Sequence, residues 1–507
     1  MSSAVEWAGR EEDERDGQEV RARVPAVGQV PGAPAGPGYV LVARGRLHGA
    51  LALVGAALRG RGGDPTRGPV TAAVVMLAVP MVLDMVMESI FAIVDIGFVS
   101  RLGAQATAAV GLTESLMTLV YTIAWGLSIG VTSMVARRTG EGDEEGAAVA
   151  AVQAIFLGLL CSAALGLAGG LAAPRLLRLM GADAGVIAVG WRYATIMLAG
   201  NGVIVFLFLL NAAFRGAGDA TVAMRVLWLA NGINLVLDPC LIFGLGPFPR
   251  LGVTGAAVAT TTGRGVAVLI QLVTLLLGSG RLRVRPRHIR LRGDVMARML
   301  RLSGTGALQS FIGEASWIAL LRLLAGFGST AVAGFTIAIR VVVFALLPAA
   351  GVGNAAATMV GQALGARDPG RAERSVWIAA FLNLCYLALA GAVLVAATPA
   401  VVRLFGGDPA TSAYATAALR TIALGFPIYA YAMVIGNSFN GAGDTRTPTL
   451  INLVAFWAWE IPLAWALSHH TSLGAEGINV AVTSAFCLLA LLGALFFRHG
   501  RWKRVVV

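Results

Sequence analysis

The chain has 507 residues, of which 57% are hydrophobic and only 13% are charged. A soluble protein carries about 25% charged residues, so most of this chain must lie in lipid. The net charge of +12 comes from arginines in the loops and termini between apolar runs, a pattern typical of membrane topology rather than of nucleic-acid binding.

The first 68 residues differ from the rest because they are rich in Arg, Glu, Gly and Pro. Residues 10–15 form a charge run, and residues 31–38 alternate Pro, Gly and Ala. The apolar stretch from Leu47 to Leu58 is about 12 residues long, too short to span a bilayer. We expect residues 1–68 to form a disordered cytoplasmic tail that contains one interfacial helix.

The rest of the chain predicts an all-α integral membrane protein with twelve transmembrane helices. The apolar runs are about 20 residues or longer and do not alternate with polar residues, which favours helices over a β-barrel. The predicted spans are 70–100, 107–136, 147–172, 186–212, 221–245, 252–278, 295–326, 331–362, 373–397, 410–438, 447–468 and 475–497.

The basic residues predict which loops face the cytoplasm. Loops after even-numbered spans hold most of the loop arginines, including six between residues 279 and 294. The positive-inside rule places these loops, and both termini, in the cytoplasm of a multi-pass plasma (inner) membrane protein. We therefore expect an amino-terminal lobe (69–278), a basic cytoplasmic linker (279–294), a carboxy-terminal lobe (295–497) and a basic cytoplasmic tail (498–507).

Two short motifs recur at one offset. Residues 215–220 (RGAGDA) return 225 positions later as residues 440–445 (NGAGDT), and residues 139–143 match residues 364–368 at the same spacing. This indicates two pseudo-symmetric six-helix bundles, the architecture of many secondary transporters. In each GAGD turn, glycine permits the positive φ that ends one helix, and we expect the aspartate to cap the next.

The first span carries three carboxylates, although an ionisable group inside a membrane is costly and marks a functional site by default. Asp84, Glu88 and Asp95 share one helical face, so that face must line water or protein. Pro80, one turn before Asp84, removes a backbone hydrogen bond and predicts a hinge.

The fifth span adds Asp238, with Asn234 one turn away and Asn231 two turns away. An amide beside a carboxylate can stabilise its charge, whereas Asn231 serves equally well as a hydrogen bond between helices. Glu460, in the eleventh span, fits either an interfacial or an interior position.

Other chemistry has no support in the sequence. The four cysteines all lie inside apolar runs without ligand spacing, so we expect neither disulfide nor metal site. There is no metal-binding histidine motif and no nucleophile elbow, so an enzyme is not expected. Membrane lipid is the expected surrounding, and a monomer the expected state.

Taken together, these features resemble the multidrug and toxic compound extrusion (MATE) family over about residues 70–497. The motifs that carry the resemblance are Val94-Asp95 with residues 98–103 (FVSRLG), the paired GAGD turns, and residues 234–239 (NLVLDP). The match is most similar to the DinF-like branch, in which the amino-terminal lobe holds the ion-coupling site.

The resemblance implies a set of coupling residues and a hinge. By position, the coupling residues are Asp95, Tyr193, Asn211, Asn234, Asp238 and Thr260, and the hinge is Pro80. Asp84 and Glu88 are secondary candidates. Glu314 matches the glutamate of a carboxylate pair used by the NorM-like branch, but Tyr429 stands where the second carboxylate belongs. The resemblance therefore favours the amino-terminal site.

The implied activity is antiport by alternating access, without a cofactor. A proton would enter as an organic, cationic and amphipathic compound leaves, and both would compete for the same negative charge. Two alternatives remain open: a sodium-coupled exporter, and a lipid-linked oligosaccharide flippase of related fold. A flippase needs a cationic cavity, for which the arginines inside the spans are candidates: Arg192, Arg225, Arg264, Arg322 and Arg340.

Overall fold

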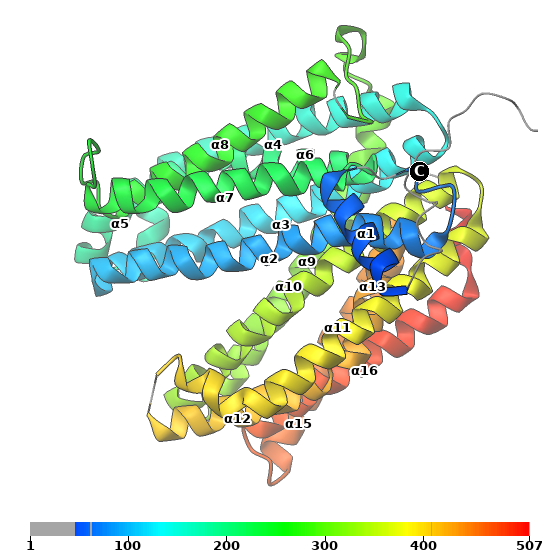
Figure 1. The fold of residues 1–507 in the computed structure, drawn as a ribbon. Coiled ribbons are helices and arrows are strands. Elements are labelled where there is room, and N and C mark those ends of the chain that lie inside the picture. Colours follow the sequence, from blue (N-terminus) through cyan, green and yellow to red (C-terminus); the bar gives the residue numbers. More distant parts are fainter. Residues whose placement is uncertain (1–45, 61–62, 279, 407, 506–507) are drawn as a thin grey trace, which may run out of the picture. The chain divides into compact units, whose positions relative to one another are not determined.

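The computed structural model describes residues 46–60, 63–278, 280–406 and 408–505, all within one compact unit that spans Gly38–Val507. The described part is helical (Figure 1). The helices are α1 Arg46–Arg59, α2 Val70–Val99, α3 Ala104–Gly140, α4 Glu144–Leu179, α5 Ala184–Ala199, α6 Gly202–Gly216, α7 Ala220–Phe243, α8 Val253–Leu277, α9 Gly293–Ala325, α10 Ser329–Gly365, α11 Pro369–Arg403, α12 Pro409–Leu424, α13 Phe426–Ala442, α14 Arg446–Asn452, a π-helical run Leu453–Glu460, α15 Ile461–His470 and α16 Glu476–His499.

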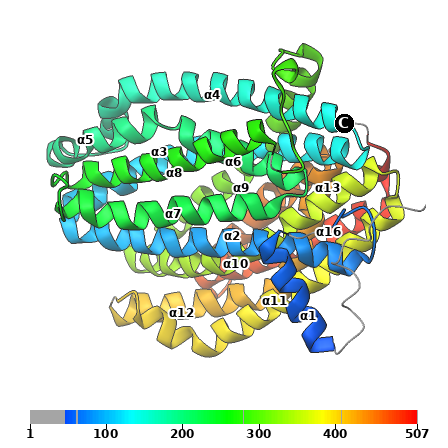
Figure 2. The ribbon, with the colours of Figure 1, turned by 45° about the horizontal axis from the view of Figure 1, so that its top comes forward.

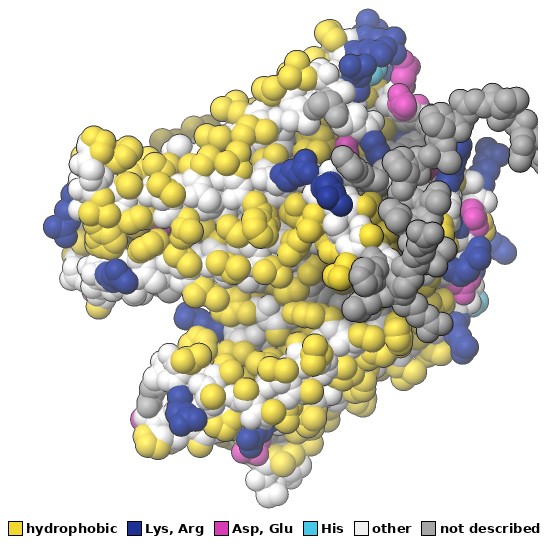
Figure 3. Space-filling model, viewed as in Figure 1, with side chains coloured by type: hydrophobic (Ala, Val, Ile, Leu, Met, Phe, Trp, Pro, Cys, Tyr) yellow, Lys and Arg dark blue, Asp and Glu magenta, His cyan; other side chains and the backbone are white. Residues whose placement is uncertain are grey.

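The predicted twelve spans are confirmed within these described ranges. Eleven helical segments are long and apolar enough to cross a membrane, and the bent pair α12–α13, which turns by 57°, makes the twelfth. The fourth span is built from α5 and α6, and the eleventh from α14, the π-helical run and α15. Figure 3 shows hydrophobic side chains over the flanks of the helices.

Two hydrophobic cores organise the helices. One is formed by α3–α8 with the end of α2, and the other by α9–α16 with the beginning of α2. α4 lies on the opposite side from α11 and α12 in both ribbon views (Figures 1 and 2). The helix α2 contributes to both cores. Met81 lies in the core of α9–α16, the carboxy-terminal core, and Val99 lies in the core of α3–α8, the amino-terminal core.

The two halves meet where backbones approach closely. A side chain at Gly351 of α10 would overlap Met81 and Val82 of α2, with its Cβ only 2.6 Å from the Met81 carbonyl oxygen. A side chain at Gly126 of α3 would likewise overlap Ala307 of α9. Gly126 and Gly351 are 225 positions apart, and so are Val82 and Ala307, so the sequence repeat is a reciprocal contact in space.

The two GAGD turns have the predicted positive φ at glycine, but their aspartates differ in the bonds that they accept. Gly218 and Gly443 both adopt φ of 86°. Asp444, one residue before the N-cap of α14, accepts from the Thr447 amide in the first turn of that helix over 3.2 Å. Asp219 makes no cap and instead accepts from the Arg281 amide over 2.8 Å, because the linker of the first repeat returns to this turn.

Residues 46–60 and 63–68 form a strap across the ends of the helices, so the prediction of a disordered tail is wrong for them. Thr221 of α7 donates to the Ala57 carbonyl over 3.1 Å. Arg371 of α11, a buried side chain, donates to the carbonyls of Pro65 and Gly68 over 2.7 and 2.9 Å. The helix α1 covers the apolar stretch for which an interfacial helix was predicted, and its position at a membrane surface stays a prediction. The predicted disorder of residues 1–45 lies outside the described residues.

Adding a methyl group at the reciprocal contact should destabilise the protein. We expect Gly351→Ala to lower the melting temperature in detergent, because overpacking costs about 1–3 kcal/mol. Gly111→Ala in α3 is the control, since no atom lies within 4 Å of its Cβ position. Equal melting temperatures for both variants would contradict the close packing.

Removing the arginine that holds the strap should release it. We expect Arg371→Ala to increase tryptic cleavage after Arg67 several-fold, because the carbonyls around Pro65 lose their donors. The exposed Arg374, which donates to the Gly370 carbonyl of its own helix, provides the control variant Arg374→Ala. Cleavage rates that do not distinguish the two variants would show that the strap is held by other contacts.

Candidate functional site

The carboxylates of α2 face protein, as their shared helical face predicts. Asp84 is 1% exposed and lies 3.6 Å from the guanidinium of Arg215 on α6, which is itself buried. Glu88 lies 3.4 Å from the guanidinium of Arg264 on α8, and Arg264 also donates to the Tyr121 hydroxyl over 3.0 Å. Each of these two secondary candidates is therefore neutralised by an arginine of its own half.

Asp238, Asn234 and Thr260 form a hydrogen-bonded cluster between α7 and α8. With its amide nitrogen toward Asp238, Asn234 donates to the carboxylate over 2.6 Å and accepts from the Thr260 hydroxyl over 3.0 Å. All three side chains are buried. Thr260 thus fixes the orientation of the amide that meets the carboxylate.

Asp95 of α2 completes this cluster. Its carboxyl group lies close to that of Asp238 and within electrostatic range of Tyr193 on α5. Two carboxyl groups brought together in a buried site disfavour being ionised at the same time, because their like charges repel.

The remaining predicted residues lie elsewhere. Asn211 accepts from the Gln271 amide over 2.5 Å and lines the central cavity beside Asp84, rather than joining the hydrogen bonds around Asp238. Glu314 is an exposed residue of α9. Pro80 is buried within α2, at the point where the helix leaves the carboxy-terminal core.

The carboxy-terminal half holds one buried carboxyl group that sequence reasoning left unassigned. Glu460 is 2% exposed, which places it in the interior and not at the interface. It ends the π-helical run and lies within electrostatic range of Tyr429, whose ring stacks on Phe486 at 4.1 Å.

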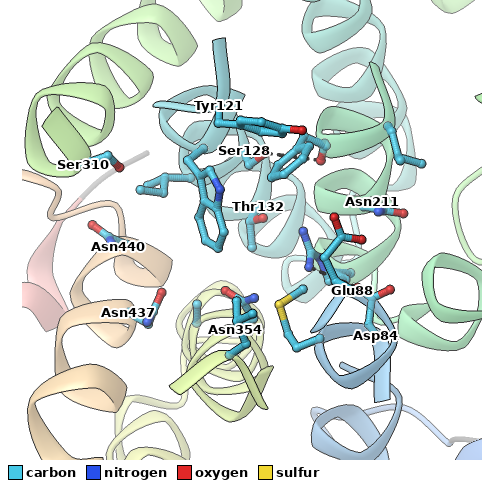
Figure 4. Close-up of a pocket in the computed structure, with 18 of the residues that line it drawn as sticks. Asp84, Glu88, Tyr121, Ser128, Thr132, Asn211, Ser310, Asn354, Asn437 and Asn440 are labelled. Carbon is cyan, nitrogen blue, oxygen red and sulfur yellow. Dashed lines mark hydrogen bonds and ion pairs between the residues drawn. The ribbon is translucent and has the colours of Figure 1, made fainter. Parts of the chain in front are cut away.

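A cavity of about 600 Å³ lies between the two halves (Figure 4). Its lining comes from α2, α3, α6, α7 and α8 on one side and from α9, α10 and α13 on the other. Volumes of about 300–1,000 Å³ are typical of sites for drug-sized ligands. The labelled polar residues that surround it are Asp84, Glu88, Tyr121, Ser128, Thr132, Asn211, Ser310, Asn354, Asn437 and Asn440.

One end of the space between the halves is closed by close packing. Gly361 of α10 meets Ala136 of α3, and Gln362 donates to the Gly216 carbonyl over 2.8 Å. The helices diverge toward the opposite end, where α5 and α12 lie (Figure 1), and Figure 3 shows a hollow between them there. The closed end is the one that carries the predicted cytoplasmic loops.

The charges of the cavity do not fit a site for a pyrophosphate group. Of the five span arginines that kept a flippase in consideration, only Arg264 lines the cavity, and it is paired with Glu88. Arg215, the other lining arginine, is paired with Asp84. The formal charges of these four residues cancel.

Sequence reasoning placed Arg215 in a loop and did not connect either arginine to a carboxylate. The helical period shows which face a residue occupies, but it does not show which neighbouring helix that face meets. The available signal was the presence of a basic residue inside the sixth span and another at the end of the fourth. Within the described ranges, no group of His, Cys, Asp and Glu side chains is arranged to hold a metal ion.

Comparison with known proteins gives a consistent result. The family model described as MatE matches residues 80–240 and 303–466. The chain is 26% identical to the probable multidrug resistance protein YoeA of Bacillus subtilis, with 85% of this chain and 93% of that protein covered. It is also 26% identical to a FAD transporter of Shewanella oneidensis, with 83% and 93% covered.

The fold matches solved structures of similar sequence. One describes an outward-facing conformation of a multidrug resistance MATE family transporter of the MOP superfamily. It superposes with a TM-score of 0.81 at 27% identity, and the match covers 87% of this chain and 98% of that one.

Breaking the hydrogen bond between Thr260 and Asn234 should destabilise the cluster. We expect Thr260→Val, a change of nearly equal volume, to lower the melting temperature in detergent, because a buried hydrogen bond contributes about 0.5–1.5 kcal/mol. The Asn234 oxygen then retains the Thr260 backbone amide, 2.9 Å away, as its donor. Thr262→Val on the exposed side of the same helix is the control. A melting temperature like that of the control would mean that Thr260 does not hold Asn234.

Proposed function

The chain belongs to the MatE family of multidrug efflux transporters, and from this premise we propose that it is a proton-coupled antiporter that exports organic compounds by alternating access. It is a multi-pass membrane transporter and not an enzyme. The observation that carries the proposal is the close approach of Asp95 and Asp238, because two neighbouring carboxyl groups in a buried site favour holding one proton between them.

The neighbours of this pair support coupling to protons. Asn234 directs its amide nitrogen, a donor, at Asp238, so this side chain stabilises the carboxylate after the proton leaves. A sodium ion needs oxygen ligands instead. In this orientation the oxygen of Asn234 faces Thr260 and not the space beside Asp238. Tyr193, near Asp95, completes the proposed coupling group. We assign Asn211 to the cavity wall and propose no role in proton binding for it.

The helix α2 can transmit the effect of proton binding to the rest of the molecule. Asp95 lies on the part of α2 that ends in the amino-terminal core, whereas residues 73–81 pack in the carboxy-terminal core. Pro80 lies at this change of partners. A change in the charge of the Asp95–Asp238 pair alters how the second part of α2 packs. Bending of α2 at Pro80 then changes its contacts at the interface between the two halves.

We also propose the membrane topology that the distribution of basic loops predicts. The amino-terminal lobe (69–278) and the carboxy-terminal lobe (295–497) rotate against each other, and the basic linker (279–294) lies in the cytoplasm with both termini. The conformation is then outward-facing, because the closed end carries the basic loops. The family branch that we propose is DinF-like, since the amino-terminal lobe holds the carboxyl pair and Glu314 is separate and exposed.

The substrate is an organic compound of a size that fits about 600 Å³. Relatives named as multidrug resistance proteins and as a FAD transporter support compounds of this class. The paired charges of the cavity give no support to a flippase.

The test is transport of a fluorescent dye by everted membrane vesicles, with a proton gradient and a sodium gradient imposed separately. We expect the proton gradient to drive dye accumulation and Asp95→Asn to reduce it more than tenfold, because an amide cannot release a proton. Asp294→Asn is the control, since Asp294 is an exposed carboxylate at the start of α9.

Two results would overturn the proposal. Transport driven by the sodium gradient alone would show that sodium, and not the proton, is the coupling ion. Proton-driven transport that Asp95→Asn leaves unchanged, with the variant present at the wild-type level, would move the coupling site away from the carboxyl pair.

A further inference from the structure

We propose that the strap and residues 501–505 form a clamp that bridges the two halves at the closed end and sets how often this end opens. This inference rests on the proposed function, because it concerns a protein whose halves rotate against each other. Both segments lie outside residues 80–466, the limits of the match to the family model. The clamp is therefore not part of the pattern that this model describes.

The closed end itself is held by close contacts between backbones. A side chain at Gly140 of α3 would overlap the Gln362 carbonyl oxygen of α10. A side chain at Gly365 of α10 would overlap the Arg137 carbonyl oxygen of α3. Gly140 and Gly365 are 225 positions apart, and so are Arg137 and Gln362, so this is a second reciprocal contact. Contacts of this kind depend on packing, and they leave no charge unpaired when they separate.

The strap is bound to the carboxy-terminal half by Arg371 of α11. This buried guanidinium donates to the Pro65 carbonyl over 2.7 and 3.0 Å, and to the carbonyls of Arg67 and Gly68 over 3.0 and 2.9 Å. The strap also leads into α2, whose first part packs in the carboxy-terminal core. Residues 63–68 therefore move with the carboxy-terminal half.

The same short segment is bound from the amino-terminal half. Arg281 donates to the Gly63 carbonyl over 2.7 Å, and its backbone amide donates to Asp219 of the first GAGD turn over 2.8 Å. Pro65 also lies against this turn, because its Cγ atom is 3.6 Å from the Cβ position of Gly218. A rotation of the halves must therefore separate residues 63–68 from one of the two sides.

Residues 501–505 bridge the halves at a second place. Trp502 is fully buried, stacks on Phe497 of α16 at 4.7 Å and donates to the Phe497 carbonyl over 3.0 Å. This fixes the segment to the carboxy-terminal half. From the amino-terminal half, the buried guanidinium of Arg137 donates to the Val505 carbonyl. Both terminal segments thus accept hydrogen bonds from arginines of the amino-terminal half.

The clamp differs from the backbone contacts in what its release leaves behind. A guanidinium that loses its carbonyl partner in a buried site is costly, because it is charged. Opening of the closed end separates Arg137 from Val505 and pulls on the strap between Arg281 and Arg371. The clamp therefore lowers the population of the conformation in which this end is open.

The experiment measures how often the closed end opens. It uses the rate at which a maleimide modifies Ser303→Cys in the purified full-length protein, with the four native cysteines replaced by alanine. Ser303 of α9 is 2% exposed and packs against Gly130 of α3 across the interface, so the thiol reacts when the halves separate there. The rate then follows the population of the open form. We expect Arg281→Ala and Arg137→Ala each to raise it by about three- to tenfold.

Each variant has a matched control that should leave the rate unchanged. Arg138→Ala removes the neighbour of Arg137, which pairs with Glu141 of its own half. Arg290→Ala removes an exposed arginine from the basic linker. Ser438→Cys, buried within α13, replaces the reporter in a second series and detects local unfolding. Its modification rate should be the same in all variants.

Combined variants test whether two separate segments are at work. Arg281→Ala and Arg371→Ala release the same strap, so the double variant should react no faster than the faster single variant. Arg137→Ala releases the other segment, so its effect should multiply with that of Arg281→Ala. Arg371→Ala also takes the place of Arg281→Ala if the latter does not fold.

Rates at Ser303→Cys that no clamp variant changes would overturn the proposal. Equal increases at Ser303→Cys and Ser438→Cys would also overturn it, because they would show a general loss of packing. These results are separate from the vesicle experiment. A protein whose clamp variants react faster but whose transport ignores Asp95→Asn retains the clamp and not the coupling site. One with proton-driven transport that requires Asp95, and with unchanged rates, retains the coupling and not the clamp.

Discussion

The reciprocal contact between the two halves is the constraint on which the rest of the structure depends. Gly126 and Gly351 let α3 and α10 approach the backbones of α9 and α2 so closely that a methyl group does not fit at either point. In a membrane, lipid is as apolar as the interior, so helix association depends on such close packing of small residues. The same helices α3 and α10 meet again at Ala136 and Gly361, where the interface is closed, and they diverge toward the opposite end.

The helix α2 combines packing in both cores with the carboxyl groups of the first span. It begins in one core, ends in the other and presents three carboxyl groups along one face. Two of these, Asp84 and Glu88, are each ion-paired with an arginine at the cavity wall. Asp95 lies instead beside the carboxyl group of Asp238. On the proposed function, one helix would therefore carry both paired charges and the carboxyl group that binds the coupling proton.

The sequence allowed the twelve spans and the repeat to be predicted, because each depends on local periodicity or on a motif. Asp95, Asn234, Asp238 and Thr260 lie close together, but their role in coupling stays a prediction. The partners of Asp84 and Glu88 and the strap were not predictable, because they depend on which helices become neighbours. Asn211 shows the same limit: its span was correctly predicted, but its side chain turns toward Gln271.

The strap has a consequence for how this protein can change over evolution. Thr221, Arg225 and Arg371 hold it through the backbone carbonyls of Ala57, Leu58, Pro65, Arg67 and Gly68. A carbonyl is present whatever the side chain, so substitutions within the strap leave these bonds intact. Selection should therefore act on the donors in the body of the protein, while the strap keeps its path and drifts in sequence. Homologous straps would be recognised by an arginine at the position of Arg371 rather than by any motif of their own.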